Sequence, residues 1–279
     1  MNHRFRTITS RLSFALLMPL CAVGLALAIG ALAPGQTRAT QIQFSTDATK
    51  RAYLPVIARA GDPCAPIPGM AYDTIPPAPV TGIDPAGNHL INLGLRGYEP
   101  VNAFKGLITV GGEPDPNAPQ FPSLFTNNRT AVFRNVYALH KWDNACNCPS
   151  SQIVTQPQVT VAWLATTPGE IIRVPDSGYD IGGGHDVMVL YASSNRLTLK
   201  YTREDDIVSG YAVYLENVCV EPSLLALYRT LNAAGRHALP ALRGAQPLGR
   251  AMGNEIGVAV RDAGTSQDPR VRSSWWIGR

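Results

Sequence analysis

Alternation of apolar and polar residues is clearest in the second half of the chain. Short apolar runs separated by turn residues predict strands over residues 171–174, 187–192, 196–201, 207–216 and 256–261. Ser194 and Asn195 fit the tight turn of a hairpin between the second and third runs. Pro247, Leu248 and Gly249 predict a turn before the last strand. The pattern therefore predicts a mainly β fold.

One segment has helical periodicity. In residues 222–234 the large apolar side chains recur on one helical face, as Leu224, Leu227, Tyr228 and Leu231. Pro222 suits the first helical turn, and Gly235 suits the position just after the last turn. We expect one helix inserted among the strands, with this face packed in the core.

The first half is more irregular. Residues 40–85 are predicted to form an extended tether, because residues 62–85 contain seven prolines and no periodicity. Apolar runs predict strands over residues 89–96, 107–110, 131–138 and 158–165. The chain is therefore divided into a leader at 1–39, the tether at 40–85, a small β-region at 86–170 and a second β-domain at 171–279.

Residues 1–39 are predicted to direct export. Three arginines and no acid occupy residues 2–11, and residues 12–33 are almost continuously apolar, which is typical of secretory signals. A cleaved signal peptide is favoured, although the apolar run is also long enough for a membrane anchor. We expect a secreted or cell-surface protein that contacts a membrane only if this leader is uncleaved.

The charge distribution argues against a nucleic-acid partner. The 279 residues carry a net charge of +4, with an isoelectric point near 8.9. Four arginines lie in residues 1–39, and removing them from the 24 basic residues leaves 20, equal to the 20 acids. Without its leader the chain is neutral, so it lacks the overall basic charge that favours nucleic acid.

Four cysteines lie beyond the leader and suggest two disulfides in an oxidising compartment: Cys64, Cys146, Cys148 and Cys219. Cysteines separated by one residue rarely bond each other, so we expect Cys146 and Cys148 to pair with Cys64 and Cys219. The alternative is a metal site formed by Cys146, Cys148 and His140, although one C-x-C without a second pair is a weak signal.

Residues 176–186 carry the most unusual chemistry, with three carboxylates, one histidine and four glycines. Asp176 and Asp180 could coordinate a hard cation, and His185 could add a nitrogen ligand. The alternative is a polar turn that leads into the strand at Val187.

Two motifs resemble the lysostaphin-like zinc endopeptidases that cut cell-wall peptidoglycan. The family shows H-x-G-x-D-I, where this chain has Asp-Ser-Gly-Tyr-Asp-Ile at 176–181. The family closes with G-x-H-x-H-F-E-V-R, where this chain has Gly-Asn-Glu-Ile-Gly-Val-Ala-Val-Arg at 253–261. The resemblance covers about residues 176–269. It implies a β-barrel or β-roll over 171–279, with the helix at about 222–234 as an insertion.

The departures from the family pattern imply that catalysis is lost. The resemblance puts Asp176, Asp180 and Gly257 at the zinc-ligand positions and Glu255 at a catalytic histidine. Since glycine supplies no side chain, two residues cannot replace the usual three protein ligands. The resemblance thus implies no catalytic residue, no metal and no cofactor. It implies a binding groove near Asp176, Asp180, His185 and Glu255.

We therefore expect an exported, non-catalytic cell-envelope protein that binds a wall glycan or peptide, or a partner protein. One alternative is a metal-dependent peptidoglycan hydrolase with a rearranged site of Asp180, His185 and Glu255. Another is a structural or assembly module of the cell surface, in which residues 86–170 bind the partner.

Overall fold

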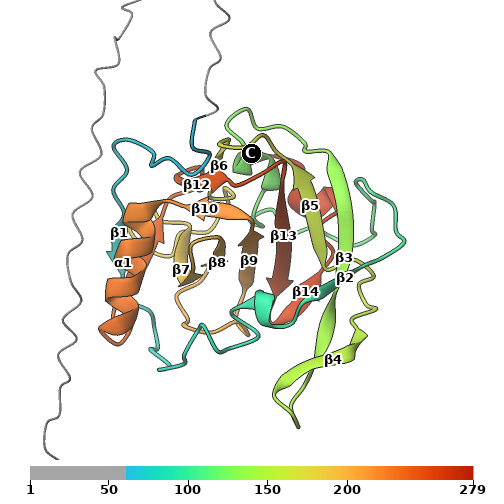
Figure 1. Ribbon diagram of the computed structural model, residues 1–279, viewed down its shortest axis with the longest axis horizontal. Helices are drawn as coiled ribbons and strands as arrows, with labels where there is room; N and C mark the ends of the chain where they lie inside the picture. The colour runs from blue at the N-terminus through green and yellow to red at the C-terminus, as the bar shows by residue number, and fades with distance from the viewer. Residues whose placement is uncertain (1–60, 279) are drawn as a thin grey trace, which may run out of the picture. The chain divides into compact units, whose positions relative to one another are not determined.

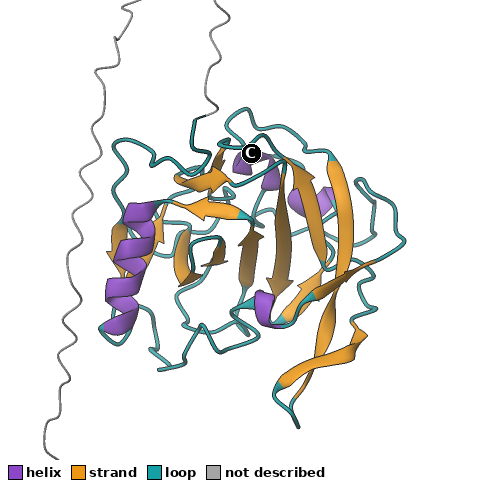
Figure 2. Cartoon of the chain, in the orientation of Figure 1, coloured by secondary structure: helices purple, strands orange, loops and turns teal. Residues whose placement is uncertain are grey.

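The computed structural model describes residues 61–278, which are mainly β (Figures 1 and 2). The leader at 1–39 and residues 40–60 of the tether lie outside the described residues. The larger sheet has eleven antiparallel strands. Nine of them pair in the order β1 (Asp73–Ile75), β11 (Leu239–Leu242), β7 (Val187–Ala192), β8 (Arg196–Lys200), β9 (Tyr211–Glu216), β13 (Glu255–Asp262), β5 (Val161–Ala165), β3 (Phe133–Asp143) and β2 (Tyr98–Pro100). In addition, β14 (Thr265–Gln267) pairs with β13, and β4 (Cys148–Ile153) pairs with β3.

The described strands do not close into a barrel. The order of strands starts at β1 and ends at β2, and these two do not pair with each other within residues 61–278. The β-barrel or β-roll that the resemblance implies for residues 171–279 is therefore not confirmed, and no closed barrel is found within residues 61–278. Within the described residues no helix is long and apolar enough to cross a membrane.

A second, three-stranded sheet contributes to the core on one side of the large sheet. It contains β10 (Val218–Val220), β12 (Pro247–Ala251) and β6 (Ile171–Arg173) (Figure 1). The same core includes side chains from the 3₁₀ helix η2 (Phe121–Leu124), from α1 (Pro222–Ala233) and from α2 (Arg272–Trp275). The turn predicted at 247–249 is wrong, because these residues pair with β6 and β10 as part of β12.

The segment before β2 packs on the other face of the large sheet. Thr198 Oγ1 donates to the Ile91 carbonyl oxygen at 2.6 Å, and Tyr214 donates to the Leu90 carbonyl oxygen at 2.7 Å. The strand predicted over 89–96 is wrong: the segment contains a short 3₁₀ helix, η1 (Leu93–Leu95), and sheet side chains bind its carbonyl groups. Side chains from this segment complete a second buried core.

Most strands predicted in the second half are confirmed, at 171–174, 187–192, 196–201 and 256–261. The strand predicted over 207–216 starts only at Tyr211, because the Asp206 carboxylate accepts from the backbone N–H groups of Val208 and Ser209 in a turn. In the first half, the strands predicted at 131–138 and 158–165 correspond to β3 and β5, whereas residues 107–110 form a loop with one bridge at Ile108. Because β5 pairs with β13, the regions 86–170 and 171–279 share one sheet within one compact unit.

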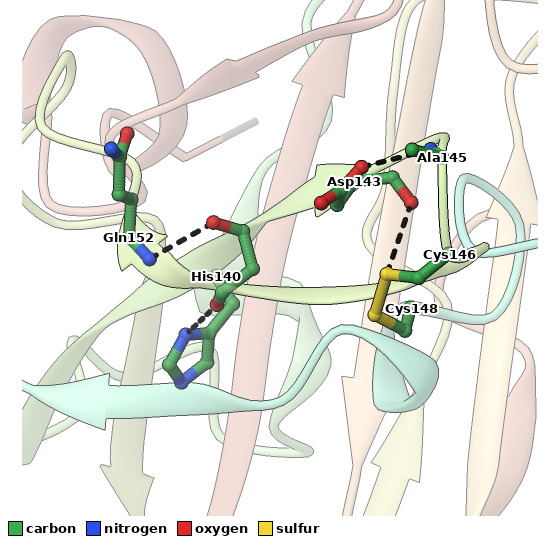
Figure 3. The surroundings of a disulfide bond; sticks show 7 residues. His140, Asp143, Ala145, Cys146, Cys148 and Gln152 are labelled. Carbon is green, nitrogen blue, oxygen red and sulfur yellow. Dashed lines mark hydrogen bonds between the residues drawn. A yellow bond between two sulfur atoms is a disulfide. The ribbon is translucent and has the colours of Figure 1, made fainter.

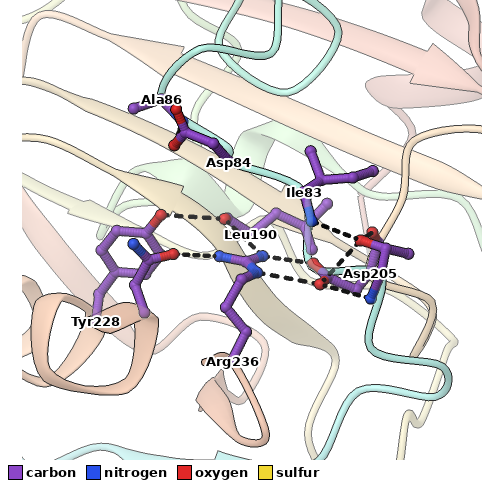
Figure 4. A network of polar contacts seen from close by, with 9 residues as sticks. Ile83, Asp84, Ala86, Leu190, Asp205, Tyr228 and Arg236 are labelled. Atoms are coloured by element: carbon purple, nitrogen blue, oxygen red, sulfur yellow. Dashed lines mark hydrogen bonds and ion pairs between the residues drawn. The ribbon is translucent and has the colours of Figure 1, made fainter. Parts of the chain in front are cut away.

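Helix α1 occupies the predicted position and ends on a buried ion pair. Gly235 follows the helix with φ of 89°, as expected for a residue just after a helical C-terminus. Arg236 then donates from Nη2 to Asp205 Oδ1 at 2.5 Å and from Nε to Asp205 Oδ2 at 3.1 Å (Figure 4). Arg236 also donates to the Leu190 carbonyl oxygen on β7. Both partners are buried, so this pair fixes the helix end against the sheet.

The disulfides correct the expected pairing. Cys64 bonds Cys219 of β10, and Cys146 bonds Cys148, with Cα atoms 5.3 Å apart in each bridge. The second bridge lies at the turn of the β3–β4 hairpin, where Asn147 adopts φ of 52° between the two cysteines (Figure 3). Strand pairing holds Cys148 opposite Asp143, whereas Cys219 pairs with Arg250 in the small sheet. The expected cross-pairing is therefore wrong, because Cys148 lies in the large sheet and Cys219 lies in the small sheet.

Candidate functional site

Asp180 and His185 bind the backbone and side chains around their own loop. Asp180 Oδ1 accepts from the N–H groups of Gly182 at 2.7 Å and Gly184 at 3.1 Å. His185 Nδ1 lies 2.8 Å from the Gly182 carbonyl oxygen, and its Nε2 lies 2.9 Å from Asp73 Oδ2. These contacts favour the interpretation of residues 176–186 as a structured turn leading into β7.

The carboxylates of Asp176 and Asp186 both lie close to the backbone of Gly244. A Cβ on Gly244 would lie 2.2 Å from Asp176 Oδ1 and 3.0 Å from Asp186 Oδ2. Asp186 accepts hydrogen bonds from the N–H groups of Ser177 and Gly244. Burial raises the pKa of Asp186 despite these bonds, and the nearby Asp176 charge acts in the same direction. The glycine thus allows two carboxylates to flank one turn.

Glu255 lies far from this loop. Met188 pairs with Lys200, Lys200 with Ala212, and Ala212 with Arg261, so the loop enters the sheet at the Arg261 end of β13. Glu255 starts that strand six residues earlier, which corresponds to roughly 20 Å of extended chain. The structure therefore does not bring Glu255 together with Asp176, Asp180 and His185 in one groove.

The sequence resemblance puts Gly257 at a zinc-ligand position. A Cβ on Gly257 would lie 3.2 Å from Trp163 Cε2 and 3.1 Å from Glu216 Cβ, so the Trp163 ring takes the space beside this glycine. Within residues 61–278, no group of three or more potential ligands among histidine, cysteine and acidic residues could hold a metal ion. His140 Nδ1 lies 2.8 Å from the Ser150 carbonyl oxygen, so the alternative C-x-C metal site gains no support.

Glu255 instead belongs to a cluster that crosses five strands. Strand register aligns Arg196, Glu216, Gly257, Trp163 and Asn135 in one row across β8, β9, β13, β5 and β3. Since side chains two residues apart share a face of a strand, Glu255 lies on the same face as Gly257. Asn135 Nδ2 donates to Glu255 Oε2 at 3.3 Å, which confirms that the two side chains meet.

Three aromatic rings lie beside this row. The ring centroids of Tyr98 and Tyr137 are 5.3 Å apart, and both lie about 6 Å from Trp163, at 6.1 and 6.2 Å. All three side chains are half-buried, and the indole Nε1 of Trp163 is buried without a hydrogen-bond partner. We call these rings together with Asn135, Arg196, Glu216 and Glu255 the aromatic–acid face.

The acids of this face differ in their surroundings. Glu216 is buried and accepts from Arg196 Nε at 2.5 Å, whereas Glu255 is half-buried. Burial raises the pKa of Glu216 more than the Arg196 charge lowers it. The pKa of Tyr98 is also raised, first by burial and then by the nearby Glu216 charge. The face therefore combines apolar rings with one ion pair and a more accessible carboxylate.

An open groove adjoins the aromatic–acid face. Pro100 pairs with Tyr137 and lines a cavity of about 650 Å³, together with Val101, Asn102, Ile153, Val154, Thr155, Gln156 and Gln158. Its size falls in the range of small-molecule sites. A ligand bound at the rings could extend into this groove.

Sequence reasoning found Glu255 but missed the rings, Glu216 and the groove. Tyr137, Trp163 and Glu216 all lay inside predicted strands, so their faces followed from alternation. These three side chains come together only because β13 lies between β5 and β9, and no local sequence pattern encodes that strand order. Comparisons with protein-family models, curated proteins and solved structures find no match to this chain.

Proposed function

We propose that this chain is an exported, non-catalytic cell-envelope protein that binds a wall glycan through the aromatic–acid face. The observation that carries the proposal is the meeting of three half-buried rings with Glu255 and Asn135. Sugars have apolar C–H surfaces that pack on rings, and their hydroxyl groups exchange hydrogen bonds with carboxylate and amide groups.

Export is supported by the basic and apolar leader of the sequence and by the two disulfides. The proposal includes a distant relationship to the lysostaphin-like endopeptidases, supported by the motifs at 176–181 and 253–261. In that relationship Glu255 and Gly257 replace two histidines, and the Trp163 ring fills the space beside the glycine.

The test is co-sedimentation of the mature protein with purified wall sacculi. We expect the wild-type protein to sediment, and Glu255→Gln and Tyr98→Leu each to weaken binding about tenfold or more. Glu113→Gln and Phe104→Leu are matched controls, because both side chains are exposed. Wild-type protein that stays in the supernatant, or equal binding by site and control variants, would overturn the proposal.

A carboxylate-pair hydrolase is a second candidate, because Glu216 has a raised pKa and Glu255 lies on the neighbouring strand. Incubation with sacculi separates the two functions. Release of soluble reducing ends that is abolished by Glu255→Gln would establish hydrolysis. Binding without release would support the non-catalytic function.

A further inference from the structure

Two buried arginines, Arg96 and Arg261, lie on the side of the large sheet that the 89–98 segment covers. Arg261 on β13 is 2% exposed, and its Nε has no hydrogen-bond partner. Arg96 is 7% exposed and donates from Nε to the His140 carbonyl oxygen at 2.8 Å. Burial and then the Arg261 charge lower the pKa of Arg96 to about 10, so the two cations lie close enough to repel.

These arginines lack the acid partners that other buried arginines have. Arg236 pairs with Asp205 at 2.5 Å, and Arg270 pairs with Asp268 at 2.7 Å. Within residues 61–278, no carboxylate oxygen lies within 4.0 Å of Arg96 or Arg261. A buried charge without a counter-charge is strongly unfavourable, so a missing anion would explain the arrangement.

His89 adds a third donor and connects the pair with the surface. Its half-buried ring stacks on Trp142, with centroids 4.2 Å apart, and its Nδ1 is buried without a partner. Burial and then the charges of Arg96 and Arg261 lower the pKa of His89, so both arginines act on this ring. A neutral imidazole can still donate from Nδ1 in one tautomer.

We propose that Arg96, Arg261 and His89 bind a small tetrahedral oxyanion, phosphate or sulfate, beneath the 89–98 segment. Guanidinium groups bind such oxygens with strong, directional hydrogen bonds, and a dianion neutralises both arginines. Lys200 on the same face is also buried, with its Nζ unpartnered, and burial lowers its pKa. It differs in having the carboxylates of Asp206 and Glu204 nearby, whose charges act to raise that pKa. The site uses none of the residues of the aromatic–acid face, and its test is independent of glycan binding.

Calorimetric titration of the mature protein with inorganic phosphate, with sulfate and with chloride at matched ionic strength tests the proposal. We expect saturable binding of phosphate and sulfate that chloride does not reproduce. Arg261→Gln and Arg96→Gln should each weaken phosphate binding at least tenfold, whereas the exposed Arg229→Gln should leave it unchanged. Titration with glycerol 1-phosphate then distinguishes a phosphate ester from free phosphate as the ligand. Equal affinity for glycerol 1-phosphate and inorganic phosphate would identify a phosphate ester, and tighter binding of inorganic phosphate would identify the free anion.

His89→Asn provides a second variant if the buried arginine variants do not fold, because His89 is half-buried. It should weaken phosphate binding several-fold while the far-ultraviolet circular dichroism spectrum stays unchanged. Binding that chloride reproduces, or that the His89 and Arg229 variants retain equally, would show an adventitious ion only and overturn the proposal. Absence of saturable binding would also overturn the proposal.

Discussion

The Trp163 ring lies against Gly257, and a Cβ added to this glycine would pack on the ring more tightly than side chains normally do. A Cβ on Gly257 would lie 3.2 Å from Trp163 Cε2 and 3.3 Å from Cζ2. The glycine therefore lets the indole lie close to β13, between Glu216 and Asn135 in the cross-strand row.

Substitution Gly257→Ala should destabilise the protein and displace the ring. Overpacking of a close contact typically costs about 1–3 kcal/mol, so the midpoint of urea denaturation should fall and the tryptophan emission should shift. Gly111→Ala is the control, because no heavy atom lies within 4 Å of its added Cβ. Unchanged stability and emission in Gly257→Ala would contradict this packing.

Removal of the Asp205 carboxylate should lower the free energy of unfolding more than removal of an exposed carboxylate. Asp205→Ala leaves Arg236 buried and unpaired at the end of α1. Breaking one partner of a buried pair costs about 3–5 kcal/mol, which urea denaturation measures directly. Glu113→Ala, at an exposed site, should stay within about 0.5 kcal/mol of wild type. Similar losses in both variants would show that the pair does not anchor the helix.

The two disulfides should contribute unequally to stability. Cys64 and Cys219 are 155 residues apart, whereas Cys146 and Cys148 are two apart. On the loop-entropy model a long loop contributes about 5 kcal/mol and a very short one about 1–2 kcal/mol. Chemical denaturation of Cys64→Ser/Cys219→Ser and of Cys146→Ser/Cys148→Ser compares them. The reverse order of stability would contradict the assigned pairing.

Glu216 should make stability depend on pH. Its folded-state pKa is raised above the ordinary value of 4.5, so the native state binds more protons than the unfolded state just above that pH. The contribution of Glu216 is therefore present below pH 4.5 and is lost as pH rises through the raised pKa. Denaturation at several pH values should show that the free energy of unfolding falls less with rising pH in Glu216→Gln than in Glu113→Gln. An equal fall in the two variants would show that Glu216 does not cause the pH dependence.

Local patterns identified most elements of the second half of the chain. Alternation and turn residues located β7, β8 and β13, and Pro222 with Gly235 marked the ends of α1. The strand predicted over 89–96 was wrong, because the apolar residues of this segment pack on a face of the sheet instead of pairing with a strand. β12 was missed because its proline and glycine are typical of turns, yet they tolerate pairing in a short sheet.

The sequence by itself determined the mainly β fold and the position of the helix at Pro222–Ala233. Only the tertiary structure decided which strands are neighbours, which cysteines bond and which side chains surround Glu255. The physical reason is that periodicity reports whether a residue faces a core, while pairing between β5 and β13 joins segments about ninety residues apart. Asp180 and His185 have the residue types of a metal site, but Asp180 accepts from its own loop, and His185 contacts this loop and Asp73 of β1. Trp163 belongs to no local motif, and only the register between β5 and β13 places it near Glu255.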